Sequence, residues 1–94
     1  MRLRWTRLAV TDLDSVYAYI AADAPDAAMG IIDRIEEATA VLIRHPESGR
    51  AGRIKGTREL VVAGTPFILL YRIRQGTIQI LAVIHGARKW PESV

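Results

Sequence analysis

The first half of the chain carries apolar residues at the spacing of α-helices. Between residues 7 and 44 they recur at every third or fourth position, as on a helix with one buried face. The first stripe consists of Ala9, Leu13, Val16, Tyr17 and Ile20, and the second of Ala28, Ile31, Ile32, Ile35, Ala38 and Leu42. The pattern therefore predicts two amphipathic helices in succession.

Capping and breaking residues set the ends of these two helices. Thr6 is a suitable N-cap for the first helix, which we expect to run to about Ala22. Pro25 fits the first turn of the second helix, where its missing N–H costs nothing. That helix should end before His45-Pro46, because proline disfavours a helical residue ahead of it. The tight link between the helices predicts an antiparallel hairpin.

The rest of the chain reads as strands. Residues 2–5 alternate polar and apolar side chains, and runs of strand length follow at 58–62, 67–73 and 77–84. The run at 67–73 is apolar on both faces, as in a central strand covered on both sides. Gly76 supplies the positive φ for a hairpin turn at 74–77. Residues 47–56 hold three glycines and read as a basic loop.

These elements predict an α+β fold in the order β-α-α-β-β-β. The helical hairpin would pack on an antiparallel sheet of about four strands, in one domain spanning residues 1–94. The first strand should pair with a C-terminal strand, because an isolated N-terminal strand is unstable.

Composition excludes several classes of protein. The chain has 94 residues, half of them hydrophobic, and no cysteine, so disulfide frameworks and thiolate zinc sites are not available. The longest apolar run, at 78–84, is too short to cross a membrane. The charged N-terminus lacks the apolar segment of a signal peptide. We therefore expect a protein of the cytoplasm that binds no membrane, metal or cofactor.

Charge is divided unevenly along the chain. Residues 1–43 carry four basic and seven acidic side chains, a net charge of −3, whereas residues 44–94 carry nine basic and three acidic ones, a net charge of +6. A basic C-terminal half favours an acidic partner, which is nucleic acid or an acidic protein segment. An ordinary solvated surface is the alternative.

Candidate chemistry gathers at the end of the last predicted strand. His85 can transfer a proton near neutral pH, and Arg88 and Lys89 can hold a phosphate. Trp90 can stack on a base. In the alternative, His85 and Trp90 serve packing and the charges are solvated.

A second basic cluster precedes the sheet. It consists of Arg50, Arg53, Lys55 and Arg58, which could follow a phosphate backbone or simply form a solvated loop. Glu59 follows on the opposite face of its strand and could pair with a neighbour. The adjacent carboxylates, Asp12 with Asp14 and Glu36 with Glu37, lack the spacing that aims both groups at one point, and we expect them to be solvated.

Five segments together resemble the ParE branch of the RelE/ParE superfamily. They are Ala9…Asp12-Leu13…Val16…Tyr19-Ile20, His45-Pro46…Gly49-Arg50, Gly56-Thr57-Arg58-Glu59-Leu60, Phe67-Ile68-Leu69-Leu70-Tyr71-Arg72 and Val83-Ile84-His85-Gly86-Ala87-Arg88-Lys89-Trp90-Pro91. Each motif is short, and their order and spacing over nearly the full length carry the resemblance.

The resemblance implies the toxin of a type II toxin–antitoxin system. ParE-like members poison DNA gyrase, whereas RelE-like members cut messenger RNA on the ribosome. Ile68 and Val61 stand where basic groups would help cleavage, and Trp90 has no acidic hydroxyl, which favours the gyrase inhibitor. A ribonuclease is the first alternative, with Arg58, Glu59, His85 and Arg88 as its catalytic candidates. The second alternative is a degenerate toxin that serves only as an antitoxin-binding corepressor.

The resemblance also implies an antitoxin partner. It would have a ParD-like ribbon-helix-helix head, which binds operator DNA, and a disordered tail, often acidic, that folds onto the toxin. The expected contacts are on the hairpin and on the sheet, at Leu13, Tyr17, Ile20, Ile31, Ile35, Arg72 and Arg74.

Overall fold

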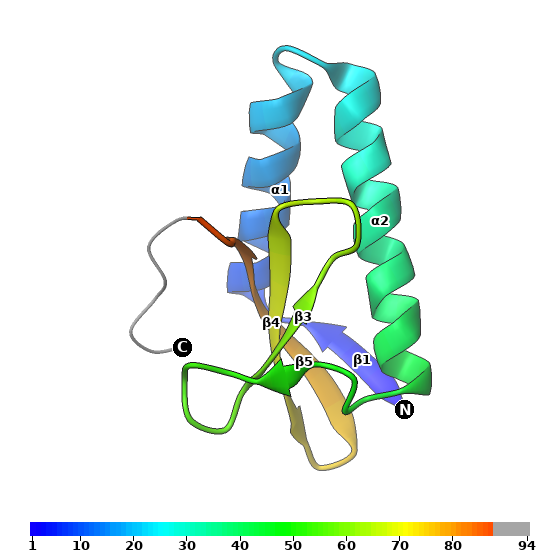
Figure 1. The fold of residues 1–94 in the computed structure, drawn as a ribbon, viewed down its shortest axis with the longest axis vertical. Helices are drawn as coiled ribbons and strands as arrows, with labels where there is room; N and C mark the ends of the chain where they lie inside the picture. The colour runs from blue at the N-terminus through cyan, green and yellow to red at the C-terminus, as the bar shows by residue number, and fades with distance from the viewer. Residues whose placement is uncertain (88–94) are drawn as a thin grey trace.

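Two antiparallel helices pack on one face of a five-stranded sheet (Figure 1). The computed structural model describes residues 1–87. The elements are β1 (Arg2–Trp5), α1 (Arg7–Ala21), α2 (Pro25–Arg44), β2 (Arg50–Ala51), β3 (Arg58–Val61), β4 (Phe67–Arg74) and β5 (Thr77–His85). The predicted α+β fold class and both predicted helices are confirmed, and α2 ends directly before His45.

The sheet is mixed rather than wholly antiparallel. Its strand order is β1-β5-β4-β3-β2, and β1 pairs with β5 in parallel while the other neighbours are antiparallel. Pairing of the first strand with a C-terminal strand is therefore confirmed, but the expectation of a wholly antiparallel sheet was wrong for this pair. No hairpin turn joins β1 to β5, since the helices and three strands lie between them, so the chain can enter β5 in either direction.

A fifth strand lies in the segment expected to be a loop. Arg50 and Ala51 form β2 and pair with Glu59 and Arg58 of β3. The Gly52 N–H donates to the Thr57 carbonyl at 2.8 Å and closes the hairpin formed by β2 and β3. Two residues are too few to show an alternating pattern, so hydrophobic periodicity could not reveal this strand.

A bulge in β5 changes which side chains face the helices. Leu70 pairs with Ala82 and Tyr71 with Ile80, so Leu81 is an extra residue on β5. Ile80 and Val83 consequently both belong to the cluster under the helices, whereas Leu81 and Ala82 both belong to the cluster on the other face. The bulge therefore turns the end of β5, including His85, toward the hairpin.

Thr6 joins the start of α1 to the sheet. Its Oγ1 accepts a hydrogen bond from the Ala9 N–H at 3.2 Å, the predicted N-cap, and donates to the Ile80 carbonyl at 2.9 Å. The Thr6 N–H donates to the same carbonyl at 3.0 Å. Since the β1–β5 ladder ends at Trp5 and Ile80, Thr6 fixes where the chain leaves the sheet and the helix begins.

The replacement Thr6→Ala should lower the free energy of unfolding by about 1–2 kcal/mol, because both the cap and the bond to Ile80 are lost. Urea denaturation followed by circular dichroism would measure the change. Thr39→Ala is the matched control, since the Thr39 hydroxyl bonds only within its own helix, to the Glu36 carbonyl. An equal loss in both variants would contradict this role of Thr6.

Candidate functional site

A pocket of about 670 Å³ opens between the helical hairpin and one end of the sheet. In Figure 1 the helices extend beyond this end of the sheet, so that the hairpin overhangs the ends of β4 and β5. The pocket is lined by Asp12, Ser15, Val16, Tyr19 and Ile20 of α1, Ala27 and Ile31 of α2, Pro66 and Phe67 beside and in β4, and Val83 and His85 of β5. Most of the lining is apolar, which suits a binding site.

Asp12 lies in this pocket and bonds the edge of β5. Its Oδ2 accepts a hydrogen bond from the Val83 N–H at 3.0 Å. Beyond Ile80, no strand among residues 1–87 lies beside β5 on the β1 side, so the carboxylate takes the place of a strand partner. Burial raises the pKa of Asp12, and the bond from Val83 offsets part of that rise. The prediction that Asp12 is solvated was therefore wrong.

His85 is held in place at the mouth of the pocket. Its ring meets Phe67 edge to face, with centroids 5.5 Å apart and planes at 85°. Its Nδ1 accepts a hydrogen bond from the Ala87 N–H at 3.1 Å. That bond needs a lone pair on Nδ1, so the neutral ring carries its proton on Nε2. Packing thus accounts for the position of His85.

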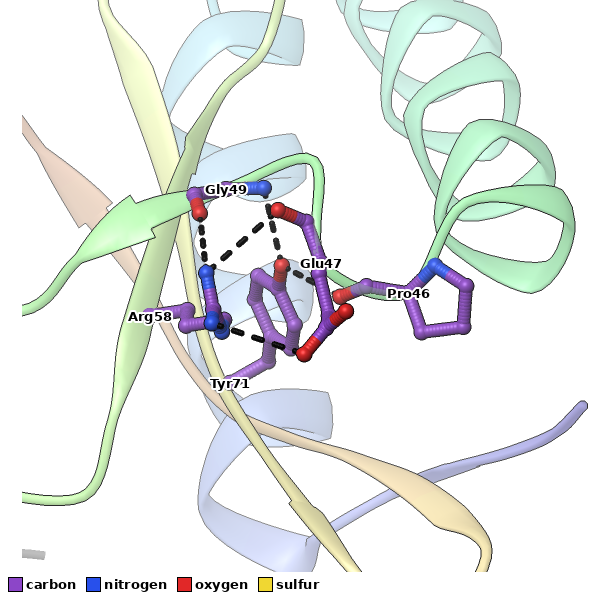
Figure 2. Close-up of polar contacts among 5 residues, drawn as sticks. All are labelled: Pro46, Glu47, Gly49, Arg58 and Tyr71. Carbon is purple, nitrogen blue, oxygen red and sulfur yellow. Dashed lines mark hydrogen bonds and ion pairs between the residues drawn. The ribbon is translucent and has the colours of Figure 1, made fainter.

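Arg58 and Tyr71 hold the loop that follows α2 (Figure 2). The Tyr71 hydroxyl donates to the Pro46 carbonyl at 2.7 Å and accepts from the Gly49 N–H at 2.9 Å. The Arg58 guanidinium donates to the Gly49 carbonyl at 2.9 Å and lies 3.8 Å from a Glu47 carboxylate oxygen. A Cβ on Gly49 would come within 2.7 Å of the Tyr71 ring, so only glycine fits against it.

Glu59 is a buried carboxylate with basic partners. Its side chain is 1% exposed and lies 3.0 Å from the Arg50 guanidinium. Its second oxygen accepts a hydrogen bond from the Arg53 backbone N–H at 2.8 Å. These bonds satisfy the buried charge and anchor β2 and the following loop on β3. The possibility that Glu59 pairs with a neighbour is confirmed.

The ribonuclease candidates that lie within residues 1–87 do not converge. Glu59 pairs with Leu70, of the cluster facing away from the helices, whereas His85 pairs with Phe67, of the cluster under them. Arg58 is bound to the loop after α2, and Lys55 is exposed between β2 and β3. The last three candidates of the basic tail, Arg88, Lys89 and Trp90, lie outside the described residues.

The residues expected to bind an antitoxin are scattered. Ile20 and Ile31 line the pocket, Leu13 packs against the core, and Tyr17 is 39% exposed. Arg74 is exposed at the other end of β4, next to Arg72, whose Nε bonds the Gln79 amide oxygen at 2.6 Å.

The inclusion of Ile35 in that set was wrong, because it is 1% exposed and lies within the core under the hairpin. The helical stripe that identified it contains core and surface positions alike. Of the pocket lining, sequence reasoning proposed Ile20, Ile31 and His85 as site residues and missed the others, including Asp12 and Phe67. A single polar residue beside an apolar stripe is the only signal that could have pointed to Asp12.

The part of the chain that the structure describes contains neither a metal-binding cluster nor a membrane-spanning helix. Within residues 1–87, no three His, Asp or Glu side chains are grouped so as to hold a metal ion. No helix in the same range is long and apolar enough to cross a membrane.

A helical hairpin packed on a mixed sheet is the fold expected for the class of RelE/ParE-type toxins. The family described as the ParE toxin of the type II toxin–antitoxin system parDE matches residues 3–90. The chain belongs to this family, and so is the toxin of a type II toxin–antitoxin system.

Individual relatives agree with this assignment. Y4kP of Sinorhizobium fredii is 48% identical over 91 residues, which are 97% of this chain and 94% of the relative. Toxin RelE2 of Caulobacter vibrioides is 34% identical over 84 residues, covering 89% and 93%. In the solved structure of the chromosomal ParDE system from P. aeruginosa, one chain superimposes with a TM-score of 0.81 at 31% identity, covering 90% of this chain and 95% of that chain.

Replacing Tyr71 with phenylalanine should lower the free energy of unfolding by about 1–3 kcal/mol, because the buried Gly49 N–H and the Pro46 carbonyl both lose their partner. Chemical denaturation would measure it. Tyr17→Phe removes the same hydroxyl from an exposed position and should change stability by less than about 0.5 kcal/mol. Equal effects would show that the Tyr71 hydroxyl does not hold the loop.

The raised pKa of Asp12 predicts a particular dependence of stability on pH. Between the ordinary value of 3.8 and the higher folded value, the folded protein binds more protons than the unfolded chain, so ionisation of Asp12 opposes folding as pH rises. Asp12→Asn keeps an oxygen for the Val83 N–H but does not titrate. The stability of the native protein relative to this variant should therefore fall as pH rises through that window. Urea denaturation from pH 3 to 7 would test it, and a rising difference would contradict it.

Proposed function

We propose that this toxin acts by binding and poisoning DNA gyrase rather than by cutting RNA. The observation that carries the proposal concerns Glu59, on the face of the sheet away from His85. Its carboxylate is ion-paired with Arg50 and accepts a hydrogen bond from the Arg53 N–H. A carboxylate engaged in this way cannot act as a base together with that histidine.

Distance supports the same conclusion. General acid–base catalysis needs both groups within hydrogen-bonding reach of one substrate. The β4 partners of Glu59 and His85, Leu70 and Phe67, are three residues apart, a separation of about 10 Å along the strand. The two side chains also point to opposite faces of the sheet. One phosphodiester could not contact both.

Two of the basic candidates, Arg58 and Arg50, hold the structure together, whereas Arg53 and Lys55 are exposed. Arg58 donates to the Gly49 and Glu47 carbonyls, and Arg50 is paired with the buried Glu59. A guanidinium with these partners has fewer donors left for a phosphate oxygen. A protein target fits such a surface better than an RNA substrate does.

The partner that neutralises the toxin is, in this proposal, a ParD-like antitoxin with a ribbon-helix-helix head and a disordered tail. The pocket beside Ile20 and Ile31 offers that tail an apolar surface. Operator DNA would be contacted only through the antitoxin, and the toxin would act in the bacterial cytoplasm. The ParDE relative of known structure supports a two-component system.

Purified protein assayed on two targets in parallel would test the proposal. Gyrase trapped as a DNA cleavage complex, with messenger RNA left intact on translating ribosomes, is the expected result. Cut message with normal supercoiling would instead make the chain a ribonuclease. Inactivity toward both targets, together with tight antitoxin binding, would favour a degenerate toxin that serves as corepressor.

A histidine variant separates the two activities in cells. His85→Ala should leave growth inhibition within about threefold of the native toxin, because no step in gyrase binding requires its proton, whereas general acid–base catalysis contributes roughly a hundredfold or more. Growth after induction without antitoxin gives the readout. His45→Ala, at the exposed end of α2, is the matched control. Loss of toxicity in His85→Ala alone would overturn the proposal.

A further inference from the structure

The segment that forms most of the pocket is uniformly acidic. Residues 8–33 contain five aspartates and no lysine, arginine or histidine. None of the five has an ion pair among residues 1–87, where the two pairs involve Glu59 and Glu47. These five carboxylates favour a cationic ligand at this end of the hairpin, although the whole chain carries a net charge of +3 and the Arg34 guanidinium lies beside Gly64, on the loop before the pocket residue Pro66.

One of these aspartates lies inside the pocket. Asp12 uses Oδ2 for the Val83 N–H, and within residues 1–87 its Oδ1 accepts no hydrogen bond. Around it stand the apolar side chains of Val16, Ile31 and Phe67. A half-buried carboxylate with a vacant oxygen in an apolar wall suits a cation on an apolar stem, and arginine is such a side chain.

We propose that this pocket binds an arginine of a partner segment, with the guanidinium paired to Asp12 and aliphatic neighbours of that arginine packed against Val16, Ile31 and Phe67. The partner is a peptide segment and not a nucleic acid, because the five aspartates of residues 8–33, none of them ion-paired within residues 1–87, repel phosphate. The segment belongs to the antitoxin, so the inference rests on the proposed function and sharpens it.

This surface changes the expected charge of the antitoxin tail. A tail that is acidic throughout would suit the basic second half of the toxin but not the end of the hairpin. The structure favours a tail with two parts, one basic and apolar at the pocket and one acidic elsewhere. The pairing at Asp12 would also relieve the cost of burying that carboxylate.

Two short peptides test the inference on the native protein without any mutation. The probes are blocked Leu-Arg-Leu and its citrulline counterpart, which keeps the shape of arginine and removes its charge. NMR titration of the labelled toxin would follow the amide signals of Val83 and of the other pocket residues. Replacing arginine with citrulline should weaken binding about tenfold, the ratio that 1.4 kcal/mol of charge-assisted bonding provides.

Matched aspartate variants then assign the effect to the pocket. Asp12→Asn should abolish the preference for arginine over citrulline, whereas Asp14→Asn, which removes the same charge from an exposed position on α1, should retain it. A circular dichroism spectrum would check that each variant folds.

Three results would overturn the inference: no shift at the pocket, equal affinity for both peptides, or equal losses in the two variants. Each is independent of the gyrase and ribosome assays, so a failure of the pocket and a failure of the proposed function can be told apart.

Discussion

The structure depends on how the exposed edge of β5 is satisfied. β1 covers this edge only from Thr77 to Ile80 and then leaves the sheet. From Ile80 onward, side chains supply the hydrogen bonds to this edge. The Thr6 hydroxyl donates to the Ile80 carbonyl, and the Asp12 carboxylate accepts from the Val83 N–H. Each of these bonds fixes the position of α1 along β5. The hairpin is thereby held over the sheet with its far end overhanging, and the pocket lies in the space beneath.

The outline of this fold could be predicted from sequence because it follows from local rules. The helical stripes, the Thr6 cap, the stop before His45 and the positive φ of Gly76 each depend on residues close together in the chain. The direction of β1 depends on β5, a partner far along the chain, and the two residues of β2 are too few to show an alternating pattern. The bulge at Leu81 was hidden as well, because every residue from Ile80 to Ile84 is apolar and the alternation has no visible phase.

The candidate site was less predictable than the fold for a related reason. The basic residues were grouped because they are close in sequence, but in the folded sheet they have different partners. Arg50 neutralises the buried Glu59, while Arg58 braces the loop that carries Gly49. Asp12 was set aside because its spacing from Asp14 does not aim both carboxylates at one point, although Asp12 by itself is the acceptor for the Val83 amide. A cluster of charges in a small domain can therefore be scaffolding, and an isolated carboxylate can belong to a binding surface.

Asp12 has a consequence for how such toxins diverge. Its carboxylate completes the hydrogen bonding of β5, so the fold itself keeps an acceptor at that position. Ser15 and Ala27 lie on the exposed rim of the same pocket, and their side chains make no hydrogen bond to β5 within residues 1–87. In the proposed binding mode, substitutions at the rim can change which partner segment fits without disturbing the hydrogen bond from the Val83 N–H to Asp12.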